Sequence, residues 1–232
     1  PARPFMFAAA FTAFGQVFSP LLRGVLFRSV LLALGVLAVM GIALFAAVEY
    51  LAQLPYPWLD TTLAIITGLG LVFGIVYLVP AASSLVAGLF VDEVAEKVER
   101  ASYPDDPLGT PQPLATSLYY SARFFVLVLA VNMLALLLLL VPGVNLIAFF
   151  LANAYLLSRE YFEMAAMRFS SPAQARALRQ ANATSIFIAG LLMTPLLMVP
   201  ILNLIMPVFG TAFMVHLHKR LKMVPTHKLI EA

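Results

Sequence analysis

The chain has 232 residues, of which 62% are hydrophobic and only 11% are charged, and it contains no cysteine. A soluble domain usually carries about a quarter charged residues, so this composition excludes an ordinary soluble protein and predicts an integral membrane protein. The lack of cysteine excludes disulfides, cysteine-ligated metals and thiol catalysis, and the net charge of +3 is too small to be informative without its placement.

Residues 1–28 are predicted to form a short interfacial helix followed by a loop. Phenylalanine recurs there at intervals of four, three and four residues, at Phe7, Phe11, Phe14 and Phe18. This spacing places four rings on one face of a helix. Such a face suits the membrane interface, and packing against the rest of the protein is an equal alternative.

The stretch FSPLLRGVLFR, at the end of this segment, is the candidate anion site. Ser19 and Pro20 predict the start of a helix, because serine caps free backbone amides and proline fits the first helical position. A helix start offers unpaired N–H groups and a partial positive charge, which together bind anions. The alternative is that the arginines anchor the helix to lipid headgroups. The candidate site consists of Ser19, Leu22, Arg23, Gly24 and Arg28.

Residues 29–91 are expected to contain two transmembrane helices, the second of them interrupted at Pro80. The apolar run then continues into VDEVAEKVER, so residues 92–122 are predicted to be a charged helix and a loop outside the membrane. Glu96 and Arg100 are four residues apart in the favourable order for an ion pair. A solvated face explains this run as well as a water-filled path between subunits does. Candidates for a permeation path or gate are Asp92, Glu93, Glu96 and Arg100.

Two stretches, LLLVPGVNLIAFF and LLMVPILNLIMPVF, repeat the pattern V-P-x-x-N-L-I inside apolar runs. Residues 186–199 and 204–217, which flank the second pattern, predict helices of about 21 Å each, too short for a hydrocarbon core of ~30 Å. Proline stops a helix and asparagine takes turn positions, so each pattern is predicted to be the tip of a hairpin that enters the bilayer and returns. Two pairs of ordinary short spans are the alternative. The predicted tips are Pro142, Asn145, Pro200 and Asn203.

We therefore expect one all-α membrane domain with two long transmembrane helices and two partly penetrating hairpins, residues 123–158 and 186–218. Residues 159–185 are predicted to form an amphipathic connector, and residues 219–232 a basic tail. A turn inside the bilayer needs protein or water around it, so several copies of the chain are expected to pack together. All 14 Lys and Arg fall in segments assigned to one face, which is cytoplasmic by the positive-inside rule.

The chain carries no nucleotide-binding, protease or hydrolase motif, so neither an enzyme activity nor a cofactor is predicted. His216 and His218 lack carboxylate partners in the sequence, so no metal site is predicted. Nucleic-acid binding has no support, because the basic residues are scattered along a membrane face. Arg159, Glu160 and Glu163, at the end of the first hairpin, raise again the question of a charged path.

Four stretches spread over most of the chain resemble the CysZ-type sulfate permeases of bacteria: SPLLRGV, AGLFVDEVAEKVE, VPGVNLIAFFLANAYLL and VPILNLIMPVFGTAFM. The resemblance implies an oligomeric sulfate permease or channel of the inner membrane that supplies cysteine biosynthesis. It aligns the family's pair of sulfate-contacting arginines with Arg23 and Gly24, so only one arginine is retained, and Arg28 is a candidate substitute. It aligns the family's acidic residue with Asp92. The alternative function is a non-transporting membrane scaffold whose hairpins wedge into one leaflet.

Overall fold

The computed structural model describes residues 3–52, 57–137 and 144–222. Within these ranges the chain forms nine α-helices and no strand, so the predicted all-α class is confirmed for them. The helices are α1 (Arg3–Val17), α2 (Arg23–Ala52), α3 (Pro57–Ser102), α4 (Leu114–Leu137), α5 (Val144–Ala166), α6 (Pro172–Ala181), α7 (Ala183–Met198), α8 (Pro200–Asn203) and α9 (Met206–Lys222).

Three helical stretches among the described residues are long and apolar enough to cross a membrane: Arg23–Ala47, Leu78–Ser102 and Leu114–Val131. They make the chain a multi-pass membrane protein. In the 18-residue window that represents the first stretch, only 6% is buried in the protein, whereas in the window of the second stretch 67% is buried. Apolar side chains that no protein covers need lipid around them, so α2 faces the bilayer and the second half of α3 lies in the protein interior.

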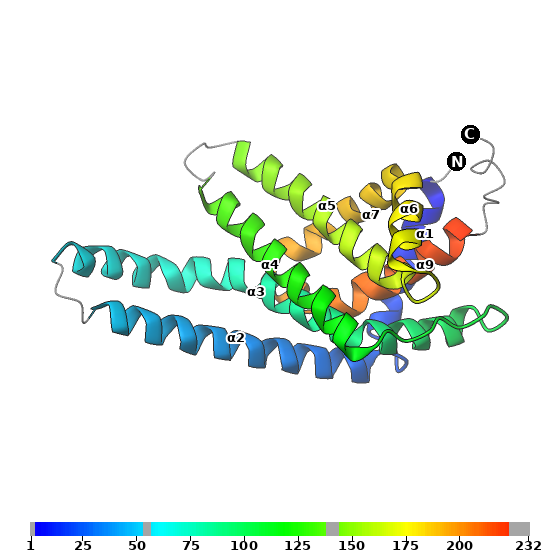
Figure 1. Cartoon of the computed structure of the whole chain (residues 1–232), viewed down its shortest axis with the longest axis horizontal. Coiled ribbons are helices and arrows are strands. Elements are labelled where there is room, and N and C mark those ends of the chain that lie inside the picture. The colour runs from blue at the N-terminus through cyan, green and yellow to red at the C-terminus, as the bar shows by residue number, and fades with distance from the viewer. Residues whose placement is uncertain (1–2, 53–56, 138–143, 223–232) are drawn as a thin grey trace.

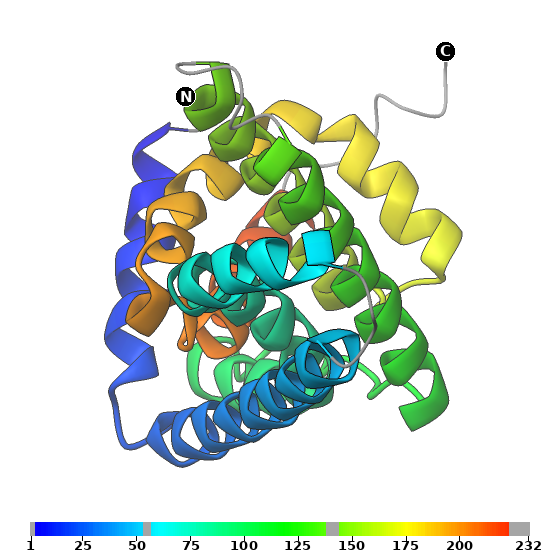
Figure 2. The same ribbon diagram turned by 90° about the vertical axis from the view of Figure 1, so that its left-hand side faces the viewer.

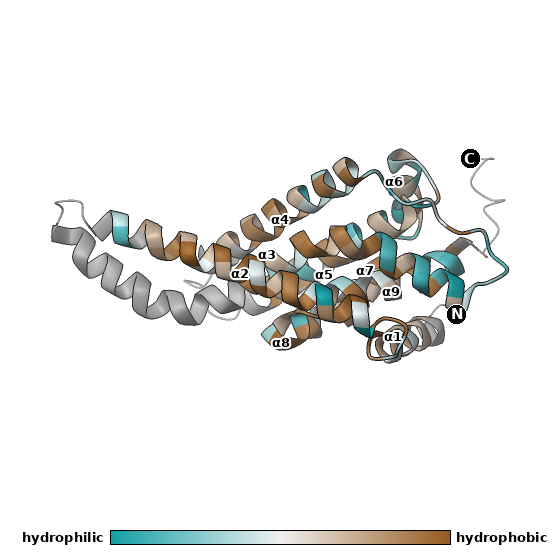
Figure 3. Ribbon diagram, turned by 90° about the horizontal axis from the view of Figure 1, so that it is seen from below, coloured by the Kyte–Doolittle hydropathy of each residue, from teal (hydrophilic) through white to brown (hydrophobic). Residues whose placement is uncertain are grey.

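The helices form an elongated molecule with two unequal parts. α2 and the first half of α3 lie side by side and project from one end, while the other helices pack together at the opposite end (Figure 1). Seen from that projecting end, α3 lies between α1, α2 and α4 (Figure 2). α3 and α9 pack against each other, and hydrophilic residues gather near α6 and the C-terminal end of α3 (Figure 3).

Several helix ends differ from the predicted ones. α3 runs through Pro80 as one helix of 46 residues, so the predicted interruption is wrong. α4 begins at Leu114, inside the segment predicted to be a loop. α4 and α5 have 24 and 23 residues, about 36 and 35 Å at 1.5 Å per residue, so these two helices are not too short to cross.

The second pair of arms is short, as predicted. α7 and α9 have 16 and 17 residues, about 24 and 26 Å, which is less than the ~30 Å of a hydrocarbon core. α7 also makes an angle of 89° with α6 before it, and α6 begins with a capping box between Ser171 and Gln174. The chain therefore turns sharply into this pair from a surface helix.

α5 and α7 approach each other closely at a glycine. A Cβ atom on Gly190 of α7 would lie 2.0 Å from the carbonyl oxygen of Ala154 in α5. Only a residue without a side chain permits this backbone contact. α5 and α7 are thus in backbone contact at a point where there is no room for an added side-chain atom.

α1 turns its phenylalanine face away from the protein. Its buried face carries small and medium apolar residues, Met6, Ala9, Ala13 and Val17. The four phenylalanine rings lie on the other side and are each at least 41% exposed. This face packs little on the described part of the chain. Of the two alternatives, a position at the membrane interface is therefore better supported than packing against the protein.

Candidate functional site

The turn between α1 and α2 differs from the predicted helix cap. α2 begins at Arg23, and the carbonyl oxygen of Ser19 accepts the N–H groups of Leu22 and Arg23 at 3.2 and 3.0 Å. The Ser19 hydroxyl donates to the carbonyl of Gln16, in the last turn of α1, at 2.6 Å. The prediction that the Ser19 side chain caps the new helix is therefore wrong, because α2 begins four residues later and no N–H of the described residues donates to the Ser19 hydroxyl.

The first turn of α2 still presents free donors. The N–H groups of Gly24 and Val25 make no hydrogen bond to any described residue. The guanidinium of Arg23 is exposed and has neither a carboxylate nor a hydrogen-bond partner within the described ranges. Leu22 is fully buried and anchors the turn in the core. Val25 is fully buried, so the donors exposed together are the Gly24 amide and the Arg23 guanidinium, and both suit an oxyanion.

Arg28 has a different environment from Arg23. Its Nη2 lies 2.5 Å from Oε1 of Glu93, and the Nζ of Lys97 lies 3.7 Å from the same oxygen. Lys97 also donates to the carbonyl of Leu21 at 3.4 Å. The structure therefore brings the predicted anion site and the charged helix into contact. Arg28 is already neutralised by Glu93, which weakens the expectation that it substitutes for the missing second arginine.

Asp92 belongs to a buried polar network that sequence reasoning missed. Arg168, in the turn after α5, pairs with Asp92 and forms a forked pair with Glu99, with N–O distances of 3.1 and 3.3 Å. Arg168 and Glu99 are both buried. Glu99 also accepts the N–H of Gly109 at 2.9 Å, and Arg168 donates to the carbonyl of Gly109 at 3.2 Å. This network holds the loop between α3 and α4 against α3 and against the turn after α5.

The remaining two path candidates pair with each other at the surface. Nη2 of Arg100 lies 2.8 Å from Oε1 of Glu96, and both side chains are exposed. The four predicted path residues therefore have three different environments: Asp92 pairs with Arg168, Glu93 with Arg28, and Glu96 with Arg100. Their neighbours in space come mostly from other helices, which the spacing along α3 could not indicate.

The tip of the second hairpin lies against the middle of α3. Pro200 begins α8, and Asn203 ends it. Asn203 is 1% exposed, and neither its Oδ1 nor its Nδ2 has a hydrogen-bond partner. The hydroxyl of Ser83, close to Pro80, donates to the Asn203 carbonyl at 3.3 Å. The predicted tip is thus packed against protein, close to Pro80 in the middle of α3.

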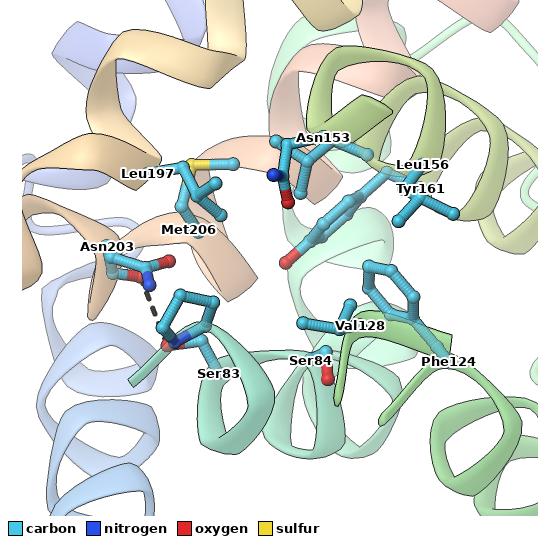
Figure 4. A pocket seen from close by; sticks show the side chains of 12 residues that line it. Ser83, Ser84, Phe124, Val128, Asn153, Leu156, Tyr161, Leu197, Asn203 and Met206 are labelled. Atoms are coloured by element: carbon cyan, nitrogen blue, oxygen red, sulfur yellow. Dashed lines mark hydrogen bonds between the residues drawn. The ribbon is translucent and has the colours of Figure 1, made fainter. Parts of the chain in front are cut away.

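A small cavity separates this tip from α4 and α5 (Figure 4). The polar ends of Asn153 and Tyr161 point toward the same space as that of Asn203. About 10 Å³ is open to the centre of a water molecule, which is about the room that one water needs. Of the first predicted tip, Pro142 lies outside the described residues, and for Asn145 only its place in α5 is described.

The two histidines of α9 take part in packing and hydrogen bonding. His216 bridges two helices, with Nδ1 2.8 Å from the Tyr103 hydroxyl and Nε2 2.9 Å from Oε1 of Gln16. His218 stacks on the ring of Phe169 at a centroid distance of 4.9 Å. Sequence reasoning considered both only as metal ligands, whereas His216 ties α9 to α1 and to the end of α3.

Comparison with known proteins identifies the family. A sequence model of the family described as sulfate transporter CysZ/etoposide-induced protein 2.4 matches residues 9–207. Because this match covers most of the chain, the chain belongs to that family, and the resemblance seen in its four motifs is confirmed. No individual curated protein and no solved structure shows significant similarity to the chain.

Proposed function

We propose that the protein is a sulfate permease or channel of the bacterial inner membrane, which supplies sulfate for cysteine biosynthesis. Membership of the sulfate transporter family supports the substrate. The observation that carries the proposal is the open donor set at the start of α2. Arg23 has no carboxylate partner among the described residues, while Arg28, five residues later, is paired with Glu93. An unpaired arginine beside the exposed free amide of Gly24 is suited to binding a dianion.

The captured anion then passes along the charged part of α3. Arg28, Glu93 and Lys97 connect the capture site to this helix through ion pairs at 2.5 and 3.7 Å. Glu96 and Arg100 extend the line of charges on the exposed side. Exposed pairs exchange partners at little cost, since such a pair contributes about 0–1 kcal/mol. Asp92 has a supporting role, because its carboxylate pairs with Arg168 and accepts the N–H of Gln112, in the loop between α3 and α4.

The energetics of uptake constrain the mechanism. Moving a dianion inward against a membrane potential of ~100 mV costs about 4.6 kcal/mol, twice the ~2.3 kcal/mol of a single charge. Every ~1.4 kcal/mol is a factor of ten, so passive uptake requires an inside concentration roughly two-thousandfold below the outside one. Rapid consumption of sulfate inside the cell sustains such a gradient, and proton coupling removes the need for it.

A membrane scaffold is the competing function. The exposed phenylalanines of α1 and the exposed apolar surface of α2 suit either role, because both roles place these helices in lipid. A scaffold needs Arg23 only to anchor α2 to lipid headgroups, so the two functions differ in whether sulfate uptake depends on Arg23.

Uptake of radiolabelled sulfate into liposomes that contain the purified protein tests the proposal, with and without a proton gradient. Arg23→Ala is expected to lower the initial rate at least tenfold, because a hydrogen bond to a charged group contributes about 1.5–3 kcal/mol. Arg176→Ala is the matched control, since Arg176 is an exposed arginine of α6 that only donates to the carbonyl of Pro172. If the wild-type protein takes up no sulfate under either condition, the scaffold is supported instead. The scaffold is also supported if Arg23→Ala and Arg176→Ala have equal uptake rates.

A further inference from the structure

Three arginines from three helices surround two glutamates at the end of α5. Arg123 comes from α4, Arg159 from α5 and Arg179 from α6. The glutamates, Glu160 and Glu163, are both buried. With both acids ionised the cluster has a net charge of +1, so it is basic although it contains two buried carboxylates. It is separate from the proposed capture site, which is formed by the turn between α1 and α2.

The two carboxylates differ in how well they are held. Glu163 accepts a hydrogen bond from Nε of Arg179 at 2.8 Å. Glu160 is 2% exposed, and its Oε1 has no hydrogen-bond partner. The nearest guanidinium atoms, Nη2 of Arg123 and Nε of Arg159, both lie 3.5 Å from this oxygen. Nε of Arg159 is also buried without a hydrogen bond. A buried acceptor and a buried donor thus face each other without bonding.

Two of the three arginines are partly exposed in the single chain. The side chains of Arg123 and Arg159 are 32% and 26% exposed, so an anion can approach their outer N–H groups without displacing a helix. Guanidinium groups offer paired donors that match the oxygen spacing of tetrahedral oxyanions. Ionised Glu160 competes with such an anion for the same two arginines, and a neutral carboxyl does not.

We propose that Arg123, Arg159 and Arg179 form a second binding site for a tetrahedral oxyanion, which fills when Glu160 takes up a proton from water. Protonation raises the charge of the cluster from +1 to +2, which matches the charge of sulfate. The choice of sulfate as the ligand rests on the proposed function, whereas the arrangement of the arginines is independent of that function. No bond other than that of the proton to Glu160 forms or breaks.

The surroundings of Glu160 favour this proton uptake. Burial raises the pKa of the Glu160 carboxyl above its usual value of 4.5, and Arg123 and Arg159 offset this only in part. The other charged groups that act on it are Glu163, which raises the pKa further, and Arg179, which lowers it. Because linkage is reciprocal, an anion bound to the arginines favours the protonated form, and the protonated form favours the anion.

Equilibrium binding of radiolabelled sulfate to the purified full-length chain in detergent tests this site, with Arg23→Ala in every protein to remove the capture site. Sulfate is expected to bind more weakly as pH rises through the raised pKa of Glu160, by at most tenfold per pH unit because one proton accompanies each anion. Adding Glu160→Gln is expected to make binding tight and independent of pH. Adding Arg159→Gln or Arg123→Gln is expected to abolish it, while Arg176→Gln is expected to leave it unchanged.

Absence of pH-linked binding in the Arg23→Ala protein, or an unaltered pH dependence after Glu160→Gln, overturns the proposal. Arg123 is one-third exposed, so its variant keeps the test valid even if the Arg159 variant unfolds. Repeating the measurement in bilayers with and without phosphatidylglycerol separates free sulfate from a lipid phosphate. Sulfate binding that persists beside the anionic lipid supports the site, and complete displacement by the lipid overturns it. Failure here leaves sulfate uptake by the wild-type protein intact, so it is distinct from failure of the proposed function.

Discussion

Charged residues of this protein differ widely in what they contribute, and burial decides the difference. Arg168 and Glu99 are buried and form a forked pair, whereas Arg100 and Glu96 form a pair at the surface, with shortest N–O distances of 3.1 and 2.8 Å. A surface pair is screened by water and contributes about 0–1 kcal/mol. Removing one partner of a buried pair leaves an uncompensated charge and costs about 3–5 kcal/mol.

Arg168→Ala is therefore expected to destabilise the protein strongly, because Glu99 and Asp92 lose their shared partner. Thermal unfolding in detergent should show a large loss of melting temperature. The control is Arg100→Ala, which removes only the surface pair with Glu96 and should show almost no loss. Equal melting temperatures for the two variants would mean that the α3–α4 loop is held by contacts other than the Arg168 network.

Glu160 makes stability depend on pH. Burial raises the pKa of Glu160 in the folded protein, so the folded state binds its proton more tightly than the unfolded state does. The stability that this proton contributes is fully present below the unfolded pKa and is lost as pH rises through the folded pKa. Glu160→Gln is expected to flatten this part of the stability profile, as measured by thermal melting across pH. A variant profile that still falls over the same range would assign the titration to another group.

At the scale of helices, the sequence predicted which segments are helical better than where they end. The apolar runs predicted α2, α3, α7 and α9, because a membrane helix needs a long uncharged stretch. The start of α4 was predicted too late, since the first hairpin was expected to begin at residue 123 and α4 begins at Leu114. The Ser19 cap was wrong because α2 begins only at Arg23, and the Ser19 carbonyl accepts the N–H groups of Leu22 and Arg23 in place of its side chain.

Contacts between distant helices were not predictable from spacing along the chain. Arg168 and Glu99 are 69 residues apart, and each reads as one more charge in a polar segment. The anion turn was predictable because its donors are neighbours in sequence. The arginine cluster around Glu160 was predictable only in part, because Arg123 and Arg179 reach it from other helices.

The close contact between α5 and α7 gives a prediction at this scale. Gly190→Ala is expected to destabilise the protein by about 1–3 kcal/mol, because its Cβ would meet the Ala154 carbonyl oxygen and backbone cannot move aside cheaply. Gly35→Ala in α2 is the control, since a Cβ there meets no atom within 4 Å. That change is expected to be neutral or stabilising by up to about 1 kcal/mol, as in any helix. Melting temperatures that fall equally for both would argue against a tight α5–α7 contact.

The whole molecule separates an apolar part from a polar part. α2 exposes a largely apolar surface, and hydrophilic residues gather at the other end of the molecule, near α6 (Figure 3). Such a surface needs lipid or further copies of the chain around it, so we propose a homo-oligomer in the bilayer. In this arrangement the second hairpin enters from the polar end and turns back at Pro200–Asn203, against α3.

The accessibility of the second hairpin tip tests this architecture most directly, and the natural absence of cysteine allows single-cysteine labelling. Ile201→Cys places a thiol at a side chain that is 78% exposed in the isolated chain, and Arg176→Cys marks the polar end. In sealed vesicles, a membrane-impermeant maleimide is expected to label position 176 from one side only. It is expected to reach position 201 from neither side until detergent is added. Labelling of position 201 from the side opposite to position 176 would show that α7 and α9 cross the membrane, and would contradict the re-entrant hairpin.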